Sequence, residues 1–317
     1  MLIAVPDDAP PVLPGSPVWP ELQARAELAY FDTLPGSEAR LAARIGTAEV
    51  VLNIRSSSRF TDRVLAACPA LRLLSLWGTG TDHVDLAAAV RHGIAITNTP
   101  GVAAVSIAEH TLALLFAVAR HIPRLDAAVR AAEWPRGQLT ELRGKTCGII
   151  GLGAIGREFA RLASAIGMRV LAWTMHPTPA FPQTPLDELY RSSDVLSLHL
   201  RLSEETRSFV GAREFALMKP TAILLNTARG ALVDEPALLE ALSSGRLAGA
   251  GLDVFSIEPL PLNQPLTALP NVVLTPHCAG ITPEALHAGL RLAVDNIWAW
   301  LAGRPQNVVL PNSGPHF

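Results

Sequence analysis

The chain has 317 residues, of which 49% are apolar and 17% are charged, and its formal net charge is −2. This length suggests about two domains, each with a core large enough to fold without disulfides or metals. The small net charge argues against nucleic-acid or anionic-membrane partners. The three cysteines are scattered without metal-ligand spacing, and the N-terminus lacks a signal peptide, so a reduced, cytoplasmic protein is expected.

Short apolar runs alternate with helical segments through the first hundred residues, which predicts a parallel sheet with helices on both faces. The predicted strands are 2–5, 28–31, 50–54, 73–76 and 94–97, and the helices include 38–45 and 61–67. The proline-rich stretch 8–20 is expected to be a surface loop, and 98–101 reads Asn-Thr-Pro-Gly, which is typical of a hinge. Two long helices, roughly 106–121 and 125–132, are predicted next.

A second alternating series starts near Lys145, with predicted strands at 147–150, 169–173, 195–198, 222–225, 249–253 and 272–274. That is about the number of strands in a dinucleotide-binding sheet. The last predicted helix carries one apolar stripe, formed by Leu286, Leu290, Ala293, Val294, Ile297 and Leu301. Because the second sheet is complete before this helix, we expect the helix to return to the first domain. The expected domains are 1–98 plus 284–317, for substrate, and an inserted cofactor domain, 99–283, that includes the two long helices.

Glycines spaced G-x-G-x-x-G follow the first strand of the second series, at Gly151, Gly153 and Gly156. A helical pattern follows at once, and Gly167 ends it. In such a turn the first glycine allows the tight bend, the second lets the backbone approach a pyrophosphate, and the third lets the helix pack on the strand. The helix N-terminus then supplies N–H groups and a partial positive charge. The context favours nucleotide binding over an ordinary strand-to-helix turn.

Three polar residues lie just past predicted strand ends in the second half: Arg229, Glu258 and His277. Reduction of a 2-oxo acid needs a clamp for the carboxylate, an acid to protonate the new alkoxide, and a group that orients that acid. Arginine, histidine and glutamate fit these roles in that order. A surface arginine, a salt-bridged glutamate and a core histidine are the alternative at this point, because spacing alone does not bring the three together.

Several further motifs occur in order: Arg55-Ser56-Ser57, Gly78 to Asp85, Asn98 to Gly101, Asn226 to Gly230, Val233 to Glu235, Leu252 to Phe255 with Glu258-Pro259, and Pro276-His277. Together with the glycine turn, they resemble the D-isomer-specific 2-hydroxyacid dehydrogenases, a family that includes phosphoglycerate dehydrogenase and glyoxylate/hydroxypyruvate reductases. The resemblance implies an α/β fold of two doubly wound parallel-sheet domains, a Rossmann cofactor domain inserted into a flavodoxin-like substrate domain. It also implies a homodimer built by the helices that follow the hinge.

The resemblance assigns roles residue by residue. His277 would be the general acid/base, Glu258 its support, and Arg229 the residue that holds the substrate. Substrate contacts would come from Arg55, Ser56, Gly80, Arg229 and His277. Cofactor contacts would come from Gly151, Gly153, Ala154, Ile155, Gly156, Thr174, Thr79, Thr227, Ala228, Asp253 and Gly280. No metal is expected. The alternative for Asp253 is a strand-end cap, and for Ser56 a solvated loop hydroxyl.

One departure from the family pattern concerns the cofactor. NAD-specific members usually carry an acid at the end of the second strand, where this chain has Thr174, followed by Met175 and His176. Without that carboxylate nothing repels a 2′-phosphate, yet no arginine follows directly to bind one. The cofactor is therefore NAD(H) or NADP(H), with relaxed discrimination expected.

The predicted function is hydride transfer between a nicotinamide cofactor and a small D-2-hydroxy or 2-oxo acid, in a cleft between the domains that closes and excludes water. Two alternatives stay open. One is a formate- or phosphite-oxidising member of the superfamily, although formate enzymes usually pair the histidine with glutamine, where this chain has Glu258. The other is a non-catalytic nucleotide-sensing protein like the corepressors built on this fold.

Overall fold

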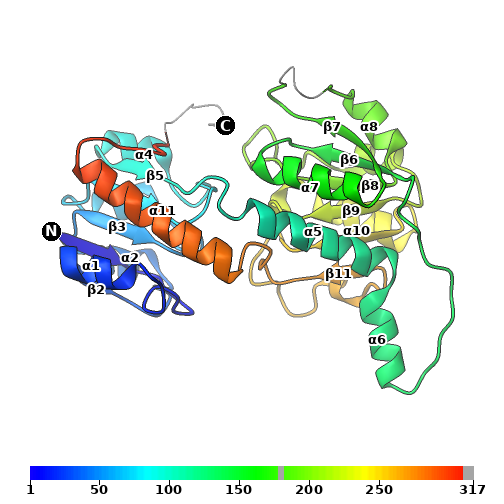
Figure 1. Cartoon of the computed structure of the whole chain (residues 1–317), viewed down its shortest axis with the longest axis horizontal. Helices are drawn as coiled ribbons and strands as arrows, with labels where there is room; N and C mark the ends of the chain where they lie inside the picture. Colours follow the sequence, from blue (N-terminus) through cyan, green and yellow to red (C-terminus); the bar gives the residue numbers. More distant parts are fainter. Residues whose placement is uncertain (178–181, 310–317) are drawn as a thin grey trace. The chain divides into compact units, whose positions relative to one another are not determined.

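The computed structural model describes residues 1–177 and 182–309. The chain divides into two compact units, Met1–Ala103 with Thr282–Phe317, and Ala104–Ile281 (Figure 1). The first unit is therefore made of two separate stretches of the sequence, and the second is continuous.

The first unit is built on a five-stranded parallel sheet with the order β2-β1-β3-β4-β5. Its strands are β1 (Leu2–Val5), β2 (Glu27–Tyr30), β3 (Val50–Asn53), β4 (Leu73–Leu76) and β5 (Ala95–Thr97). All four residues of β3 and of β4 are buried, as expected of central strands covered on both faces. This order is the flavodoxin-like one, in which ligands bind beyond the carboxyl ends of the strands.

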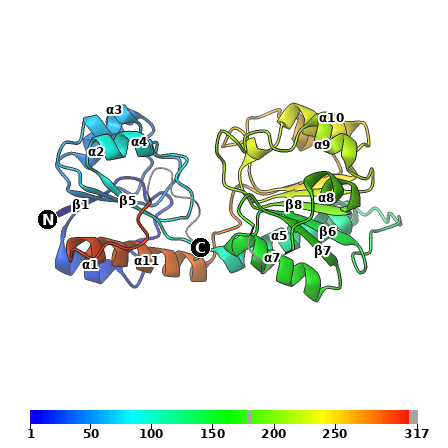
Figure 2. The same ribbon diagram turned by 90° about the horizontal axis from the view of Figure 1, so that it is seen from above.

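Helices cover both faces of this sheet, as Figure 2 shows for the first unit. They are α1 (Trp19–Arg25), α2 (Glu38–Ile45), α3 (Asp62–Ala66), α4 (Leu86–Arg91) and α11 (Pro283–Leu301). Local sequence sets the ends of α2, because the Ser37 hydroxyl accepts from the Arg40 N–H at its start and Gly46 takes a positive φ at its end. The last helix, α11, packs on this unit through Leu290, Val294 and Ile297, and its Ala293 carbonyl accepts a hydrogen bond from Ser75.

Two expectations about the first unit were wrong in part. The stretch 8–20 is a loop up to Val18 and exposes Pro10, Pro14 and Pro17, but Leu13 and Val18 lie in the core and the α1 helix begins at Trp19. The buried Asp8 carboxylate accepts the N–H groups of Val12 and Leu13, so these two groups are satisfied without water. Leu301 was expected on the buried stripe of the last helix but is 45% exposed.

The second unit is built on a six-stranded parallel sheet with the order β11-β10-β9-β8-β6-β7. Its strands are β6 (Thr146–Ile150), β7 (Arg169–Trp173), β8 (Val195–Leu198), β9 (Ile223–Asn226), β10 (Gly249–Leu252) and β11 (Val272–Leu274). The chain order reverses at β6, whose neighbours are β7 on one side and β8 on the other. Ligands of open α/β sheets bind at such a switch point, and the glycine turn follows β6 directly. The predicted α/β fold class is confirmed.

Helices again cover both faces of this sheet (Figure 2). One layer contains α5 (Ala104–Ala119), which packs on α7 (Ala154–Ala165), and the other contains α8 (Leu186–Ser192), α9 (Ala212–Leu217) and α10 (Glu235–Ser243). Short 3-10 helices occur at η1 (Gly230–Leu232) and η2 (Pro265–Ala268). The helix α6 (Ile122–Arg130) begins three residues before its predicted start, because a proline in the first helical turn, Pro123, costs no hydrogen bond.

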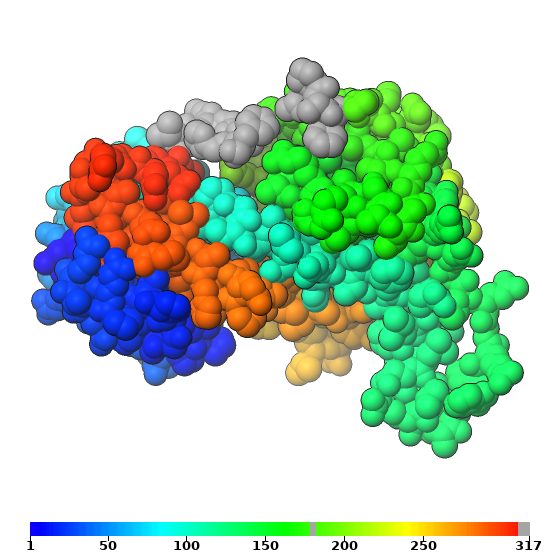
Figure 3. All heavy atoms as spheres, viewed as in Figure 1, coloured from blue at the N-terminus to red at the C-terminus, as the bar shows by residue number. Residues whose placement is uncertain are grey.

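The helix α6 and the residues after it extend away from the rest of the second unit (Figure 3). Residues 131–139 are exposed throughout, and Trp134 is 74% exposed. Across residues 1–177 and 182–309, no single helix has the length and apolar character to cross a membrane, and α5 with α6 pass that test only as a pair bent by 60°.

Candidate functional site

The glycine turn after β6 has the geometry that a pyrophosphate requires. Gly151 has φ +101°, and a Cβ there would lie 2.6 Å from the carbonyl oxygen of His199. A Cβ on Gly156 would lie 1.9 Å from the carbonyl oxygen of Gly151, so only glycine lets α7 approach the turn. A Cβ on Gly153, in contrast, would meet no described heavy atom within 4 Å, so its backbone faces open space.

The N-terminus of α7 is available to an anion. The helix begins at Ala154 after Gly153, and no described side chain caps its first turn. The N–H groups of Ala154, Ile155 and Gly156 therefore keep their hydrogen-bonding capacity and the positive end of the helix dipole. Together with the open space at Gly153, this arrangement fits the diphosphate of a dinucleotide.

The neutral side chain of His199 lies next to the glycine turn. The ring of His199 lies 5.5 Å from the Phe159 ring of α7, and its Nε2 lies 2.9 Å from the Ser197 hydroxyl. Burial lowers the pKa of His199 to about 3, although part of the residue reaches the surface. At neutral pH the ring is uncharged, so it adds no charge to the phosphate site beside it.

The strand β7 ends without an acidic residue. The partly buried Thr174 follows it, and its N–H donates to the Oε1 atom of Gln183 at 2.9 Å. Met175 and His176 are exposed. Thr174 thus follows the second strand of this sheet, and the next two residues carry no carboxylate.

The loop after β9 carries Arg229 and is fixed by an asparagine that the sequence analysis did not single out. The Asn226 side chain accepts from the Ala228 N–H at 3.1 Å and donates to the Arg229 carbonyl at 2.9 Å. The neighbouring Thr227 hydroxyl lies 2.9 Å from the Thr111 hydroxyl of α5. The position of Asn226 at the carboxyl end of a strand was the available signal, because ligand-facing loops of parallel sheets begin there.

Gly230 brings the Arg229 loop against the loop after β10. A Cβ on Gly230 would lie 2.0 Å from the carbonyl carbon of Phe255 and 2.3 Å from its oxygen. The same Phe255 donates its N–H to the Oε1 atom of Glu258 at 2.9 Å. The two loops therefore touch backbone to backbone, between Arg229 on one side and Glu258 on the other.

His277 and Glu258 form a close pair. The Nδ1 atom of His277 lies 2.6 Å from Oε2 of Glu258, and both side chains are about one-third exposed. Burial raises the pKa of Glu258, but hydrogen bonds from His277 and from the Phe255 N–H, with the charges of His277 and Arg229, outweigh it and lower the pKa overall. An ionised carboxylate only accepts hydrogen bonds, so Nδ1 carries a proton and Nε2 is left for another partner.

Of the other candidates in the second unit, Asp253 is fully buried and Gly280 is partly buried. The Asp253 carboxylate accepts from the backbone of the loop that holds His277.

The strands β9, β10 and β11 are neighbours in the sheet, so the loops of Arg229, Glu258 and His277 emerge side by side. The structure brings the three side chains to one edge of one sheet, the edge that also carries the glycine turn.

The candidates in the first unit lie at the carboxyl edge of its own sheet. The Nη2 atom of Arg55 donates to the Pro10 carbonyl at 2.5 Å and lies 4.0 Å from Oδ1 of Asp8. Its charge is therefore held against the loop after β1. Ser56 and Thr79 are exposed and Gly80 is partly buried. In the loop after β4, the Thr79 carbonyl accepts a hydrogen bond from the Asn98 side chain at 2.9 Å, which fixes this loop.

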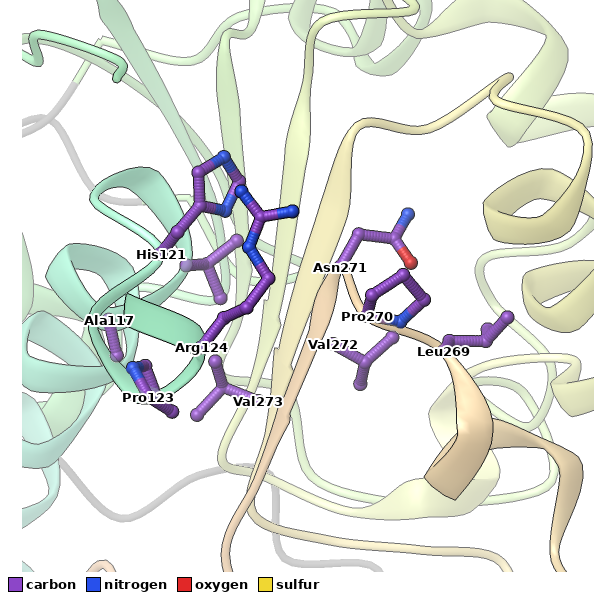
Figure 4. A pocket seen from close by; sticks show the side chains of 10 residues that line it. Ala117, His121, Pro123, Arg124, Leu269, Pro270, Asn271, Val272 and Val273 are labelled. Carbon is purple, nitrogen blue, oxygen red and sulfur yellow. The ribbon is translucent and has the colours of Figure 1, made fainter. Parts of the chain in front are cut away.

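The second unit also contains a cavity of about 170 Å³ beside the edge strand β11 (Figure 4). Its walls come from the α5–α6 junction, including His121 and Arg124, and from the residues that lead into and form β11, including Asn271. None of the predicted site residues lines it. It opens near the amino-terminal ends of the strands, whereas the candidates of this unit follow carboxyl ends.

Comparison with known proteins gives consistent matches. The family model described as "D-isomer specific 2-hydroxyacid dehydrogenase, NAD binding domain" matches residues 112–279. A glyoxylate reductase of Aeropyrum pernix is 43% identical over 269 residues, which cover 78% of this chain and 80% of the relative.

Two solved structures extend the similarity to nearly the whole chain. An acyclic imino acid reductase (Bsp5), solved with NADPH and D-Arg, has a TM-score of 0.90 at 32% identity and covers 98% of this chain and 100% of its own. An NADPH-dependent glyoxylate/hydroxypyruvate reductase of Sinorhizobium meliloti, solved with NADP and malonate, has a TM-score of 0.86 at 30% identity, with 97% and 96% covered.

Proposed function

The chain belongs to the D-isomer-specific 2-hydroxyacid dehydrogenase family, and we propose that within it the protein reduces a small 2-oxo acid of the glyoxylate or hydroxypyruvate class to the corresponding 2-hydroxy acid, in the D form where C2 becomes a stereocentre. As a member it is an NAD(P)-dependent oxidoreductase. The observation that carries the proposal is the His277–Glu258 pair at 2.6 Å, on the sheet edge that also holds the glycine turn.

The proposed reaction has a hydride transfer, which needs the cofactor, and a proton transfer, which the chain's own residues carry out. When bound, the nicotinamide would supply the hydride for C2 of the substrate. His277 gives its Nε2 proton to the oxygen on C2 as the alkoxide forms. Glu258 accepts a hydrogen bond from the Nδ1–H group, which fixes the ring orientation and places a negative charge beside the ring. Arg229 binds the substrate carboxylate, because a planar guanidinium offers two parallel N–H donors to it.

Further contacts are proposed from the positions that match the family. Arg55, Ser56 and Gly80 would contact the substrate. The cofactor is bound by Gly151, Gly153, Ala154, Ile155, Gly156, Thr174, Thr79, Thr227, Ala228, Asp253 and Gly280. The cytoplasmic location stays a prediction.

Turnover of a small substrate panel tests the function. We expect NADH or NADPH to be oxidised with glyoxylate or hydroxypyruvate at a kcat of about 1–10³ s⁻¹, the ordinary range for enzymes. Pyruvate with the reduced cofactor and formate with the oxidised cofactor serve as comparison substrates. Tight cofactor binding without turnover of any 2-oxo acid would contradict the proposal and favour a nucleotide-sensing protein.

The same assay tests the proposed cofactor preference. With Thr174 after β7, no carboxylate repels a 2′-phosphate, and no arginine follows directly to bind one. We expect the kcat/KM values for NADH and NADPH to differ by less than about a thousandfold, which corresponds to roughly 4 kcal/mol. A larger preference for NADH would show that another group excludes the phosphate.

We also propose a homodimer built through α5, α6 and residues 131–141. Ile122 and Val129 of α6 are each 52% exposed, and Trp134 is 74% exposed. An extended arm with large apolar side chains in water is unfavourable unless a partner covers it. Sedimentation equilibrium should give twice the chain mass, and an Ile122→Asp, Val129→Asp variant should give a larger monomer fraction. A wild-type chain that sediments as a monomer at micromolar concentration would refute the dimer.

A further inference from the structure

His277 has a backbone conformation that requires support. Its φ is +51°, a left-handed value that is unfavourable for a non-glycine residue. Its N–H donates to the Asp253 carbonyl at 2.7 Å and lies 3.1 Å from the Thr275 carbonyl. The direction of the imidazole therefore depends on how firmly this turn is held.

A single buried carboxylate holds the turn on both sides of His277. The Oδ1 atom of Asp253 accepts the Cys278 N–H at 2.9 Å, and its Oδ2 atom accepts the Ala279 N–H at 2.9 Å. On the other side, the Thr275 hydroxyl donates to Oδ1 at 2.6 Å. Asp253 is fully buried, so these protein donors take the place of water around its carboxylate.

The third member of this arrangement is His110, on α5. Its Nε2 atom lies 3.0 Å from the Thr275 hydroxyl oxygen. Thr275 has one hydroxyl proton and gives it to Asp253, so it can only accept from His110. His110 Nε2 must therefore carry a proton, and the bonds run in one direction, from His110 to Thr275 to Asp253.

The same side chains could be taken for a metal site, because ligand atoms of His110, Asp253 and Cys278 lie within 4.8 Å of one another. The existing bonds argue against that interpretation. Both Asp253 oxygens already accept hydrogen bonds, and burial together with the Asp253 charge raises the pKa of the Cys278 thiol. A metal ligand must be a thiolate, so this cysteine is poorly suited.

We propose that His110, Thr275 and Asp253 are positioning residues that lock the His277 turn and so aim Nε2 of His277 at the substrate. The inference rests on the proposed function in taking His277 as the proton donor. Asp253 would then hold the His277 turn as well as contact the cofactor. His110 and Thr275 had no expected role from the sequence, and they would hold the same turn.

The test removes the hydroxyl group of Thr275, which links His110 to Asp253, and keeps the volume of the side chain nearly the same. Thr275→Val loses the hydroxyl, Thr275→Ser keeps it, and Thr146→Val is the matched control. Thr146 is a buried threonine of the same unit, whose hydroxyl accepts from Arg169 at 3.0 Å. Each variant is assayed with NADPH and hydroxypyruvate across pH, and its NADPH affinity and melting temperature are measured.

We expect Thr275→Val to lower kcat by about 10- to 100-fold, because a displacement of about 1 Å at the proton donor has that effect. Its pH profile should shift while KM and NADPH affinity stay within about threefold. Thr275→Ser should recover kcat to within about threefold, and Thr146→Val should match the wild type. Wild-type kcat and pH profile in Thr275→Val would overturn the inference.

Failure of the proposed function can be recognised separately, because the wild type would then turn over no 2-oxo acid. In that case the Nδ1–H resonance of His277, recorded on protein labelled with [¹⁵N]histidine, supplies the readout. The resonance should move in Thr275→Val and stay in place in Thr275→Ser. An unchanged resonance in Thr275→Val would overturn the positioning role without reference to activity.

Discussion

Replacing His277 with alanine is expected to lower kcat for 2-oxo acid reduction by about 10²–10⁴. The variant loses the imidazole that pairs with Glu258 at 2.6 Å, so the new alkoxide must take its proton from water. The glycine turn follows β6, several strands away from β11 in the sheet, so cofactor affinity should stay near the wild-type value. Steady-state kinetics with NADPH and hydroxypyruvate, together with NADPH titration followed by fluorescence, measure both quantities.

The Glu258→Gln variant is the informative companion to His277→Ala. The pKa of Glu258 is lowered in the folded chain, so its carboxylate is charged and supports His277 at neutral pH. This charge is lost only as the pH falls through the lowered pKa. A glutamine of the same size still accepts a hydrogen bond but supplies no charge. We expect a smaller loss, of about 10- to 100-fold, than for His277→Ala. An ordinary turnover number in His277→Ala would rule out its role as the acid.

The parts of the site that could be predicted from the sequence depend on local rules. The turn at Gly151, Gly153 and Gly156 was predictable because one strand, one bend and one helix contain all the required geometry. Arg229, Glu258 and His277 were predictable as residues that follow strand ends, because ligand-facing loops of parallel sheets begin there. Their placement side by side depends on β9, β10 and β11 being adjacent in the sheet, which the sequence alone did not establish.

The parts that could not be predicted depend on contacts between distant segments. His110 and Thr275 are 165 positions apart, and nothing in their local sequence indicates that they share a hydrogen bond. The stretch 8–20 was assigned to the surface from its prolines, and its burial depends on Asp8 satisfying the N–H groups of Val12 and Leu13. Side-chain hydrogen bonds of this kind replace water, and composition does not reveal them.

The contact between Gly230 and Phe255 leads to the second large effect. In Gly230→Ala the new Cβ would lie 2.0 Å from the carbonyl carbon, 2.3 Å from the oxygen and 2.5 Å from the Cα of Phe255. All three are backbone atoms, so no side chain can rotate away and the two loops must separate by about 1 Å. Arg229 and Glu258 lie on opposite sides of that contact. We expect kcat/KM to fall by about 100-fold or more.

Gly137→Ala is the matched control for this substitution. A Cβ on Gly137 would meet no described atom within 4 Å, so the same chemical change adds no clash there. NADPH affinity separates a displaced catalytic loop from a misfolded chain, because the glycine turn follows a different strand and should still bind the cofactor within about threefold of wild type. If Gly230→Ala keeps a kcat/KM within a factor of two of Gly137→Ala, the spacing of the two loops does not set the geometry of Arg229 and Glu258. A large loss of kcat/KM with intact cofactor binding would instead support a role for this backbone contact in placing Arg229, which binds the substrate, relative to the Glu258–His277 pair.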